Sequence, residues 1–176
     1  DRRLEIVQLD GSDDGITQIN DWLKNRQDLD AVHIIAHGDS AQVELGTATL
    51  DTEALAEREA AIAGWASALT DNADLFIIGC DVAEDAEGRL FIDRLAELTT
   101  ADVAASETPL GNELLGGNWA LEYQTGTLEV ASLVAGDTDY GFLLDAAEAA
   151  AVELCTHEKQ DDLIVALTTG DSAIDG

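Results

Sequence analysis

Leu75-Phe76-Ile77-Ile78 is the most apolar run in the chain, and it ends at Gly79-Cys80-Asp81. A short apolar run that stops at a glycine is typical of a strand buried on both faces of a parallel sheet. A second run of this kind, Ala31-Val32-His33-Ile34-Ile35-Ala36, ends at His37-Gly38. The two runs predict buried strands at the centre of an α/β domain.

Helical and extended patterns alternate on either side of these two runs. Apolar residues recur with helical spacing in three segments and with strand spacing in several shorter ones. The predicted helices are 15–23, 52–69 and 88–98, the further strands are 4–9 and 102–105, and the hairpins are 43–50 and 119–132. This alternation favours an α/β fold with a mostly parallel sheet.

The composition limits the classes of partner. The chain has 176 residues, 46% of them apolar, which is enough for one domain with a substantial core. It has 37 acidic and 8 basic residues and a net charge of −29, so nucleic acids and anionic membrane surfaces are poor partners. No run of 18 apolar residues predicts a membrane span. Such acidity fits an extracellular, marine or halophilic protein.

The composition changes near Leu144. Residues 1–144 carry the alternating pattern, and residues 145–176 are predicted to be an acidic tail or linker. The chain begins at Asp1 and contains no Met, so we expect it to be a piece of a longer precursor.

Residues of the types used in nucleophilic catalysis follow both central strands. His37 follows one strand and Cys80 follows the other. Functional groups of parallel sheets gather beyond the carboxyl ends of the strands, so neighbouring strands would bring the two side chains into one cleft. A thiol needs a base to become a thiolate, and imidazole is the usual base. Each residue taken alone is more often structural, because a buried Cys commonly acts as a small apolar side chain.

His33 lies four residues before His37, on the same face of the predicted strand. It is a second candidate for a catalytic role, although a packed, hydrogen-bonded histidine is the commoner case. The two cysteines, Cys80 and Cys155, are too few for a disulfide framework and lack the spacing of a zinc site. A disulfide between them in an oxidising medium would silence the thiol.

A His-Gly pair after one apolar strand and a Gly-Cys pair after another resemble the caspase-like cysteine peptidases (clan CD), which include caspases, gingipains, separase and CHAT domains. Four segments are similar, more closely still, to an N-terminal domain of uncharacterised function in giant, repeat-rich bacterial adhesins and exoproteins. They are 31–38, 77–83, 101–106 and 116–122. The similarity covers residues 4 to 144. That domain usually begins with a further strand and helix, which this chain lacks.

The resemblance implies a three-layer caspase-like fold with helices on both faces of the sheet and a late hairpin. It implies a Cys–His dyad in which His37 is the base and Cys80 the nucleophile. The backbone N–H groups of Gly38 and Cys80 match the positions of the oxyanion hole. Asp39, Asp81 and Glu107 would flank the cleft, and acidic walls favour an Arg or Lys side chain of the substrate.

The segment from Asp10 to Asp21 resembles the start of a calcium loop, with Asp10, Ser12, Asp14 and Asp21 as its candidate ligands. The alternative, which we favour, is a strand-to-helix turn whose Asp residues cap the next helix. No other cofactor is expected.

The function that fits these residues is a cysteine endopeptidase acting on a polypeptide, either its own precursor or another secreted surface protein. Lys159 is a candidate autocleavage site, because it lies in a polar stretch of the tail and a tethered segment has a high effective concentration. The alternative is an inactive caspase-like module for anchoring or interaction at the head of a bacterial adhesin. Both alternatives place the domain outside the cell or at its surface.

Overall fold

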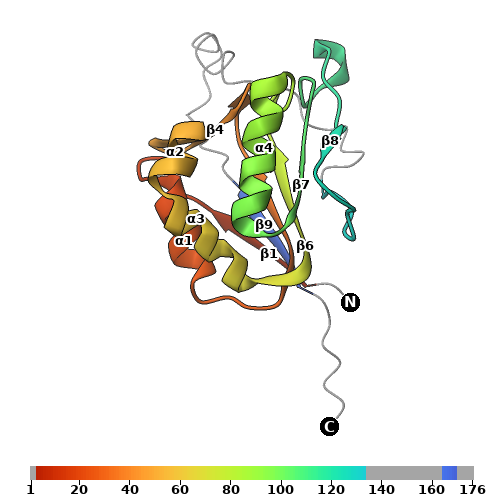
Figure 1. Ribbon diagram of the computed structural model, residues 1–176. Helices are drawn as coiled ribbons and strands as arrows, with labels where there is room; N and C mark the ends of the chain where they lie inside the picture. The colour runs from red at the N-terminus through yellow and green to blue at the C-terminus, as the bar shows by residue number, and fades with distance from the viewer. Residues whose placement is uncertain (1–2, 134–163, 170–176) are drawn as a thin grey trace.

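The computed structural model describes residues 3–133 and 164–169. Its main sheet has six strands in the order β1-β9-β2-β6-β7-β8 (Figure 1). The strands are β1 (Arg3–Gln8), β2 (Leu29–Ile35), β6 (Leu69–Ile78), β7 (Asp102–Ala105), β8 (Tyr123–Gln124) and β9 (Ile164–Thr169). A second, three-stranded sheet contains β3 (Gly38–Asp39), β4 (Gln42–Leu45) and β5 (Ala48–Asp51).

The fold is α/β with a mixed, mostly parallel sheet, as the alternation predicts. Strands β2, β6 and β7 pair in parallel, and β9 is antiparallel to both β1 and β2. Strands β1, β2, β6 and β7 therefore run in one direction. The helices between them are α1 (Gly15–Leu23), α2 (Thr52–Glu57), α3 (Glu59–Ala63), the 3₁₀ turn η1 (Gly64–Ala68) and α4 (Ala86–Thr99).

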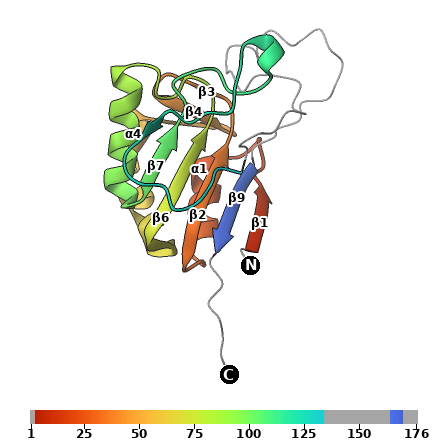
Figure 2. The same ribbon diagram turned by 90° about the vertical axis from the view of Figure 1, so that its right-hand side faces the viewer.

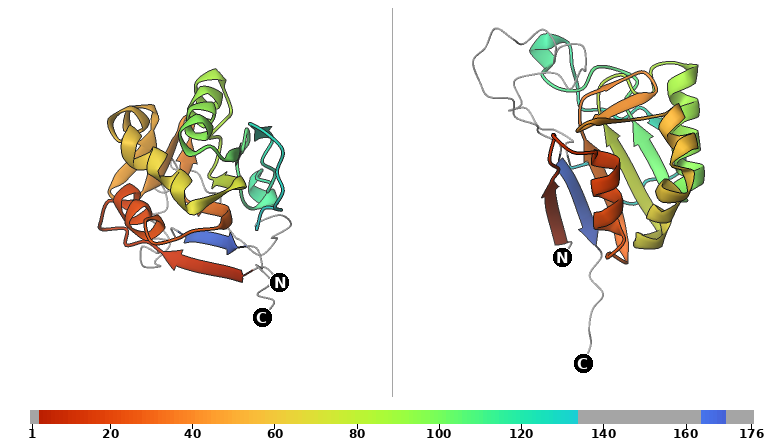
Figure 3. Two further views of the ribbon diagram at one scale, coloured as in Figure 1. Left: turned by 60° about the horizontal axis from the view of Figure 1, so that its bottom comes forward. Right: turned by 90° about the vertical axis from the view of Figure 1, so that its left-hand side faces the viewer.

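These helices cover one face of the main sheet (Figures 1 and 3). Helix residues such as Ile19 and Phe91 share one buried cluster with Ile34 and Ile77 of the central strands. The connections from β1 to β2, β2 to β6 and β6 to β7 all advance in the same direction across the sheet. Right-handed crossovers that advance in one direction place their helices on the same face. Helices on both faces, as the resemblance implied, are therefore absent from the described part of the chain.

Coil covers the opposite face of the sheet. In Figure 2 the coil of residues 119–133 crosses in front of β6 and β2, while α1 lies behind them. Its apolar side chains pack on a second buried cluster, which contains Ala31, Phe76, Ile78, Cys80, Ala104, Leu110 and Val130. The expected late hairpin is wrong, because 127–132 forms no strand and β8 pairs with β7 instead. The short helix η2 (Glu113–Leu115) lies in the preceding loop.

Helix α1 has the predicted bounds, whereas the long helix predicted over 52–69 is wrong. The chain leaves helical geometry at Arg58 (φ −111°), so α2 and α3 are separate helices. Leu69 belongs to β6, because it pairs with Leu29 of β2. Pairing with a strand forty residues away has overridden the helical spacing of the local sequence.

Part of the predicted tail belongs to the main sheet. Strand β9 (Ile164–Thr169) lies between β1 and β2 and pairs with both. The predicted boundary at residue 144 therefore does not separate all of the sheet from a tail. In the described ranges, the longest helix is α4, with 14 residues, and none has the length and apolar character of a membrane span.

Candidate active site

The carboxyl ends of β2 and β6 lie side by side. Their register pairs Ile35 with Ile78, and the Ala36 N–H donates to the Ile78 carbonyl at 3.1 Å. His37 and Cys80 each come two residues after this last pair. The prediction depended on these strands being neighbours, and that condition is met.

The alternation of side chains puts Cys80 on the coil-covered face. Phe76, Ile78 and Cys80 belong to the cluster on that face, and Ile35 packs against it. His33 stacks on Phe76, with ring centroids 4.3 Å apart. Odd-numbered residues of β2 therefore share a face with even-numbered residues of β6, and β2 itself ends at Ile35.

Two glycines allow the backbones of the two strand ends to touch. A Cβ atom on Gly79 would lie 3.2 Å from the nitrogen of Gly38 and 3.1 Å from the carbonyl oxygen of Ala36. The Gly38 amide is thus next to the residue that precedes Cys80. The two N–H groups expected to hold an oxyanion come from adjacent strand ends.

Gly38→Ala is expected to lower the free energy of unfolding by about 1–3 kcal/mol, because overpacking of a filled site costs that amount. The new Cβ would lie 2.8 Å from Val82 Cγ2 and 3.0 Å from the Cys80 carbonyl oxygen. Gly64→Ala is the matched control, because a Cβ there meets nothing within 4 Å. Urea unfolding of both variants measures the difference, and equal stability would show that the strand ends are not in contact.

The thiol of Cys80 is fully buried and lies under a loop. Cys80 is 0% exposed. Its Sγ donates to the Leu110 carbonyl at 3.3 Å and accepts from the Leu110 N–H at 3.1 Å. We call residues 107–119 the covering loop. A peptide cannot reach the thiol until this loop moves.

Leu110 is a residue of the candidate site that the sequence does not reveal. It is 0% exposed, whereas Leu114 in the same loop is 94% exposed. Both are lone leucines among glycines and polar residues, so no local pattern distinguishes the one that covers the thiol. Only the fold separates them.

The turn that carries Cys80 is held from behind by the chain that follows β7. Ser106 Oγ donates to the Gly79 carbonyl at 2.5 Å, and the Ala83 N–H donates to the Ser106 carbonyl at 2.8 Å. Asp81 has left-handed backbone geometry (φ 57°), which turns the chain directly after the cysteine. These bonds fix the position of the thiol.

The imidazole of His37 is half-buried. Its Nδ1 atom is buried and has no hydrogen-bond partner in the structure of residues 3–133 and 164–169. In a triad this atom would donate to an orienting carboxylate or carbonyl. No carboxylate or carbonyl group of the described residues accepts a hydrogen bond from this atom.

His33 is packed as expected, but it lacks the expected hydrogen bonds. Neither of its ring nitrogens has a partner among the described residues. Burial lowers the pKa of His33 to about 4, so the ring is neutral near pH 7. A neutral ring stacked on Phe76 is a structural role, and nothing in its surroundings favours catalysis.

The three acidic residues expected to flank the cleft all follow strand ends, but their surroundings differ. Asp39 is exposed, with its Oδ1 accepting from the Ser40 N–H at 2.8 Å. Asp81 is half-buried in the turn after Cys80. Glu107 forms an ion pair with Arg89 at 2.7 Å. Arg89 offsets the charge of Glu107.

The four candidate ligands of the calcium loop already have hydrogen-bond or ion-pair partners. Asp10 Oδ1 accepts from Ser12 Oγ at 2.6 Å, and Asp21 pairs with Lys24 at 2.6 Å. Asp14 caps α1 through the Thr17 N–H at 2.8 Å and pairs with Arg58 at 2.6 Å. The Arg58 side chain lowers the pKa of Asp14. A guanidinium takes the place that a cation would need, so the capping alternative is the one that the structure supports.

Two residues named from the sequence, Cys155 and Lys159, lie outside the described residues.

A family model described as "Domain of unknown function (DUF4347)" matches residues 1–144. No curated protein and no solved structure matches the chain.

Proposed function

This chain belongs to the DUF4347 family of domains of unknown function, and we propose that it is a caspase-like cysteine endopeptidase with a Cys80–His37 dyad. The observation that carries the proposal is the meeting of two strand ends. His37-Gly38 and Gly79-Cys80 follow paired parallel strands and have their backbones in contact. Paired nucleophile and base at one sheet edge are the arrangement that thiol catalysis needs.

In the proposed reaction, His37 takes the thiol proton and the Cys80 thiolate attacks a peptide carbonyl carbon. The N–H groups of Gly38 and Cys80 stabilise the tetrahedral oxyanion. The C–N bond then breaks, and the imidazolium returns its proton to the leaving amine. Water, deprotonated by the same imidazole, hydrolyses the thioester and restores the thiol.

The described state of this peptidase is a latent one. Burial of a leucine contributes roughly 1.5–3 kcal/mol, and each hydrogen bond adds about 1 kcal/mol. Leu110 has both kinds of contact with the thiol, so lifting the covering loop costs roughly 4 kcal/mol. At about 1.4 kcal/mol per tenfold change, roughly one molecule in a thousand has an open site. A substrate or partner that binds the open state would activate the enzyme.

The substrate that we propose is an exported polypeptide, the precursor of this domain among them. Asp39 and Asp81 favour a basic side chain next to the cut bond. Cleavage after Lys159 fits that preference, and the location that we propose is outside the cell or on its surface. A large bacterial adhesin or exoprotein is the proposed context of the domain.

A second candidate function, an inactive module for anchoring or interaction, is favoured by one observation. The Cys80 thiol both donates to and accepts from the backbone of Leu110, which is a satisfied structural role for a buried cysteine. In this module the covering loop never opens and His37 has no influence on the thiol.

Alkylation of Cys80 by iodoacetamide near neutral pH distinguishes the two candidates. Leu110→Ala is expected to increase the rate at least about tenfold, because the lost side-chain burial stabilised the closed loop. Leu114→Ala, in the same loop but exposed, is the matched control and should not change the rate. All variants carry Cys155→Ser, so that the signal comes from one thiol.

The decisive comparison adds His37→Ala to the Leu110→Ala variant. For a dyad, the rate falls, because the imidazole no longer favours the thiolate. A rate that is indifferent to His37 contradicts the peptidase and supports the inactive module.

A further inference from the structure

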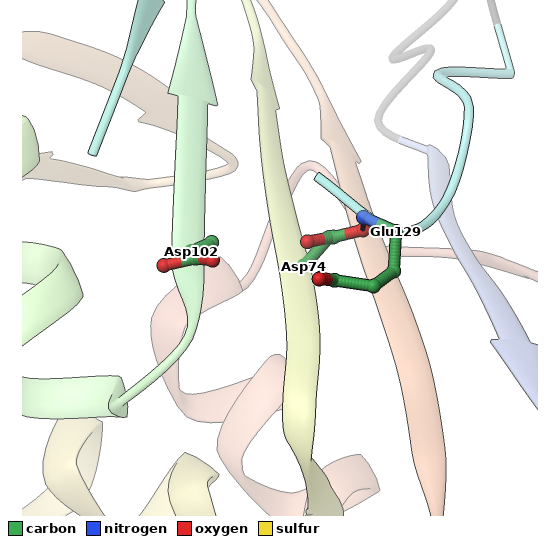
Figure 4. A group of neighbouring side chains, drawn as sticks. All are labelled: Asp74, Asp102 and Glu129. Carbon is green, nitrogen blue, oxygen red and sulfur yellow. Dashed lines mark hydrogen bonds between the residues drawn. The ribbon is translucent and has the colours of Figure 1, made fainter. Parts of the chain in front are cut away.

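Three carboxylates meet at the end of the sheet remote from Cys80. Asp74 is in β6, Asp102 begins β7 and pairs with it in register, and Glu129 comes from the coil that crosses this face (Figure 4). One oxygen of each lies within 4.8 Å of the others. The three residues come from distant parts of the sequence, so no sequence spacing predicts the cluster.

Asp74 is the unusual member of this group. It is 0% exposed. Its Oδ2 accepts from the backbone N–H groups of Glu129 at 2.9 Å and Val130 at 2.7 Å. Its Oδ1 is buried and has no hydrogen-bond partner in the described part of the chain. Burying a carboxylate oxygen without a hydrogen-bond partner costs free energy, so a ligand bound at Oδ1 would stabilise the fold.

We propose that Asp74, Asp102 and Glu129 bind one Ca²⁺ ion. Calcium bonds oxygen ligands at about 2.4 Å, so two oxygens on opposite sides of the ion are about 4.8 Å apart. All three oxygens satisfy that limit without any change in the backbone. Mg²⁺ needs shorter bonds of about 2.1 Å and near-octahedral geometry, so it demands a more rigid site than Ca²⁺ does.

Charge also supports a dication at this place. Three acidic groups in contact repel one another, and burial raises the pKa of Asp74. A bound Ca²⁺ replaces that repulsion with attraction and supplies the missing partner of Oδ1. Glu129 also lines an open depression, together with Asp30 and Asp71, so this member of the group faces solvent.

The proposed ion fastens the coil to the sheet. Glu129 is on the coil, and Asp74 and Asp102 are on the strands. Gly126 of the same coil packs so closely that a Cβ there would overlap the Asp102 carboxylate. The six residues from Asp74 to Cys80 span roughly 20 Å of strand, so the ion site is separate from the dyad and independent of the peptidase proposal.

Calorimetric titration and thermal unfolding of the whole chain test the site. We expect one Ca²⁺ per chain and a rise in Tm of about 5–10 °C when Ca²⁺ exceeds its Kd a hundredfold. Solutions are matched in ionic strength with NaCl, because the net charge of −29 makes the protein sensitive to salt. Added EDTA should reverse the shift.

Asp102→Asn and Glu129→Gln should each remove most of the Ca²⁺-dependent shift. Asp10→Asn, in the loop that resembles a calcium loop, is the matched control and should keep it. Glu129 is exposed, so its variant is expected to fold even where changes at the buried Asp74 interfere. The proposal is overturned if Ca²⁺ gives no shift beyond NaCl, if both variants keep the shift, or if Asp10→Asn alone abolishes it.

Discussion

Replacing Cys80 with Ser or Ala is expected to lower the rate of peptide cleavage by at least about 10³-fold. Removal of a catalytic nucleophile costs this much or more, because the covalent intermediate can no longer form. His37→Ala should produce a loss of similar size, since the two side chains act as one unit. Mass spectrometry of products from a Lys- or Arg-containing peptide, and of the chain after long incubation, measures the effect.

The two Cys80 variants should differ in stability although both are inactive. Serine can keep the hydrogen bonds to the Leu110 backbone, whereas alanine leaves a buried N–H and a buried carbonyl without a partner. Each unpaired buried group costs about 1–3 kcal/mol, so Cys80→Ala should have the lower Tm. This comparison separates loss of the nucleophile from loss of the fold. Cleavage by either variant at the wild-type rate would refute the dyad.

Acid is expected to destabilise the protein through His33 between about pH 6.5 and pH 4. The pKa of His33 is lowered from 6.5 to about 4 by burial, so the unfolded chain binds a proton in this range and the folded chain does not. Stability therefore falls as the pH decreases through this window. The shift corresponds to about 3 kcal/mol at the low end of the range.

His33→Phe is the variant that isolates this effect, because phenylalanine keeps the ring stack on Phe76 and does not titrate. Urea unfolding from pH 8 to pH 4 should give parallel curves above pH 7 and a smaller acid-induced loss in the variant below pH 6.5. Asp74 acts in the opposite sense, since burial raises its pKa and the folded state then binds the extra proton. The difference between wild type and variant cancels the Asp74 contribution. Equal slopes below pH 6.5 would show that His33 is charged in the folded state.

Patterns among near neighbours in the sequence were sufficient to predict the strands and helices next to His37 and Cys80. The apolar runs at 31–36 and 75–78 are strands, and the helical spacing at 15–23 is a helix with Asp14 as its cap. Asp85 begins α4 in the same way, by accepting from the Gly88 N–H at 2.9 Å. Caps and periodicity involve residues within one or two turns, so the sequence shows them directly. His37 and Cys80 could be named because each directly follows such a strand.

Contacts between distant residues decided the rest. The bonds between Cys80 and Leu110 join residues 30 apart in sequence, and those between Asp74 and Glu129 join residues 55 apart. Strand β9 enters the sheet from far beyond the alternating pattern, and the pairing of Leu69 ends a helix that local spacing would have continued. Such contacts leave no periodic mark on the chain, because each depends on which surfaces the packed elements bring together. The sequence by itself determined the two central strands and named the candidate dyad residues that follow them. The tertiary structure alone decided that the thiol is covered, that the helices share one face and that three carboxylates meet.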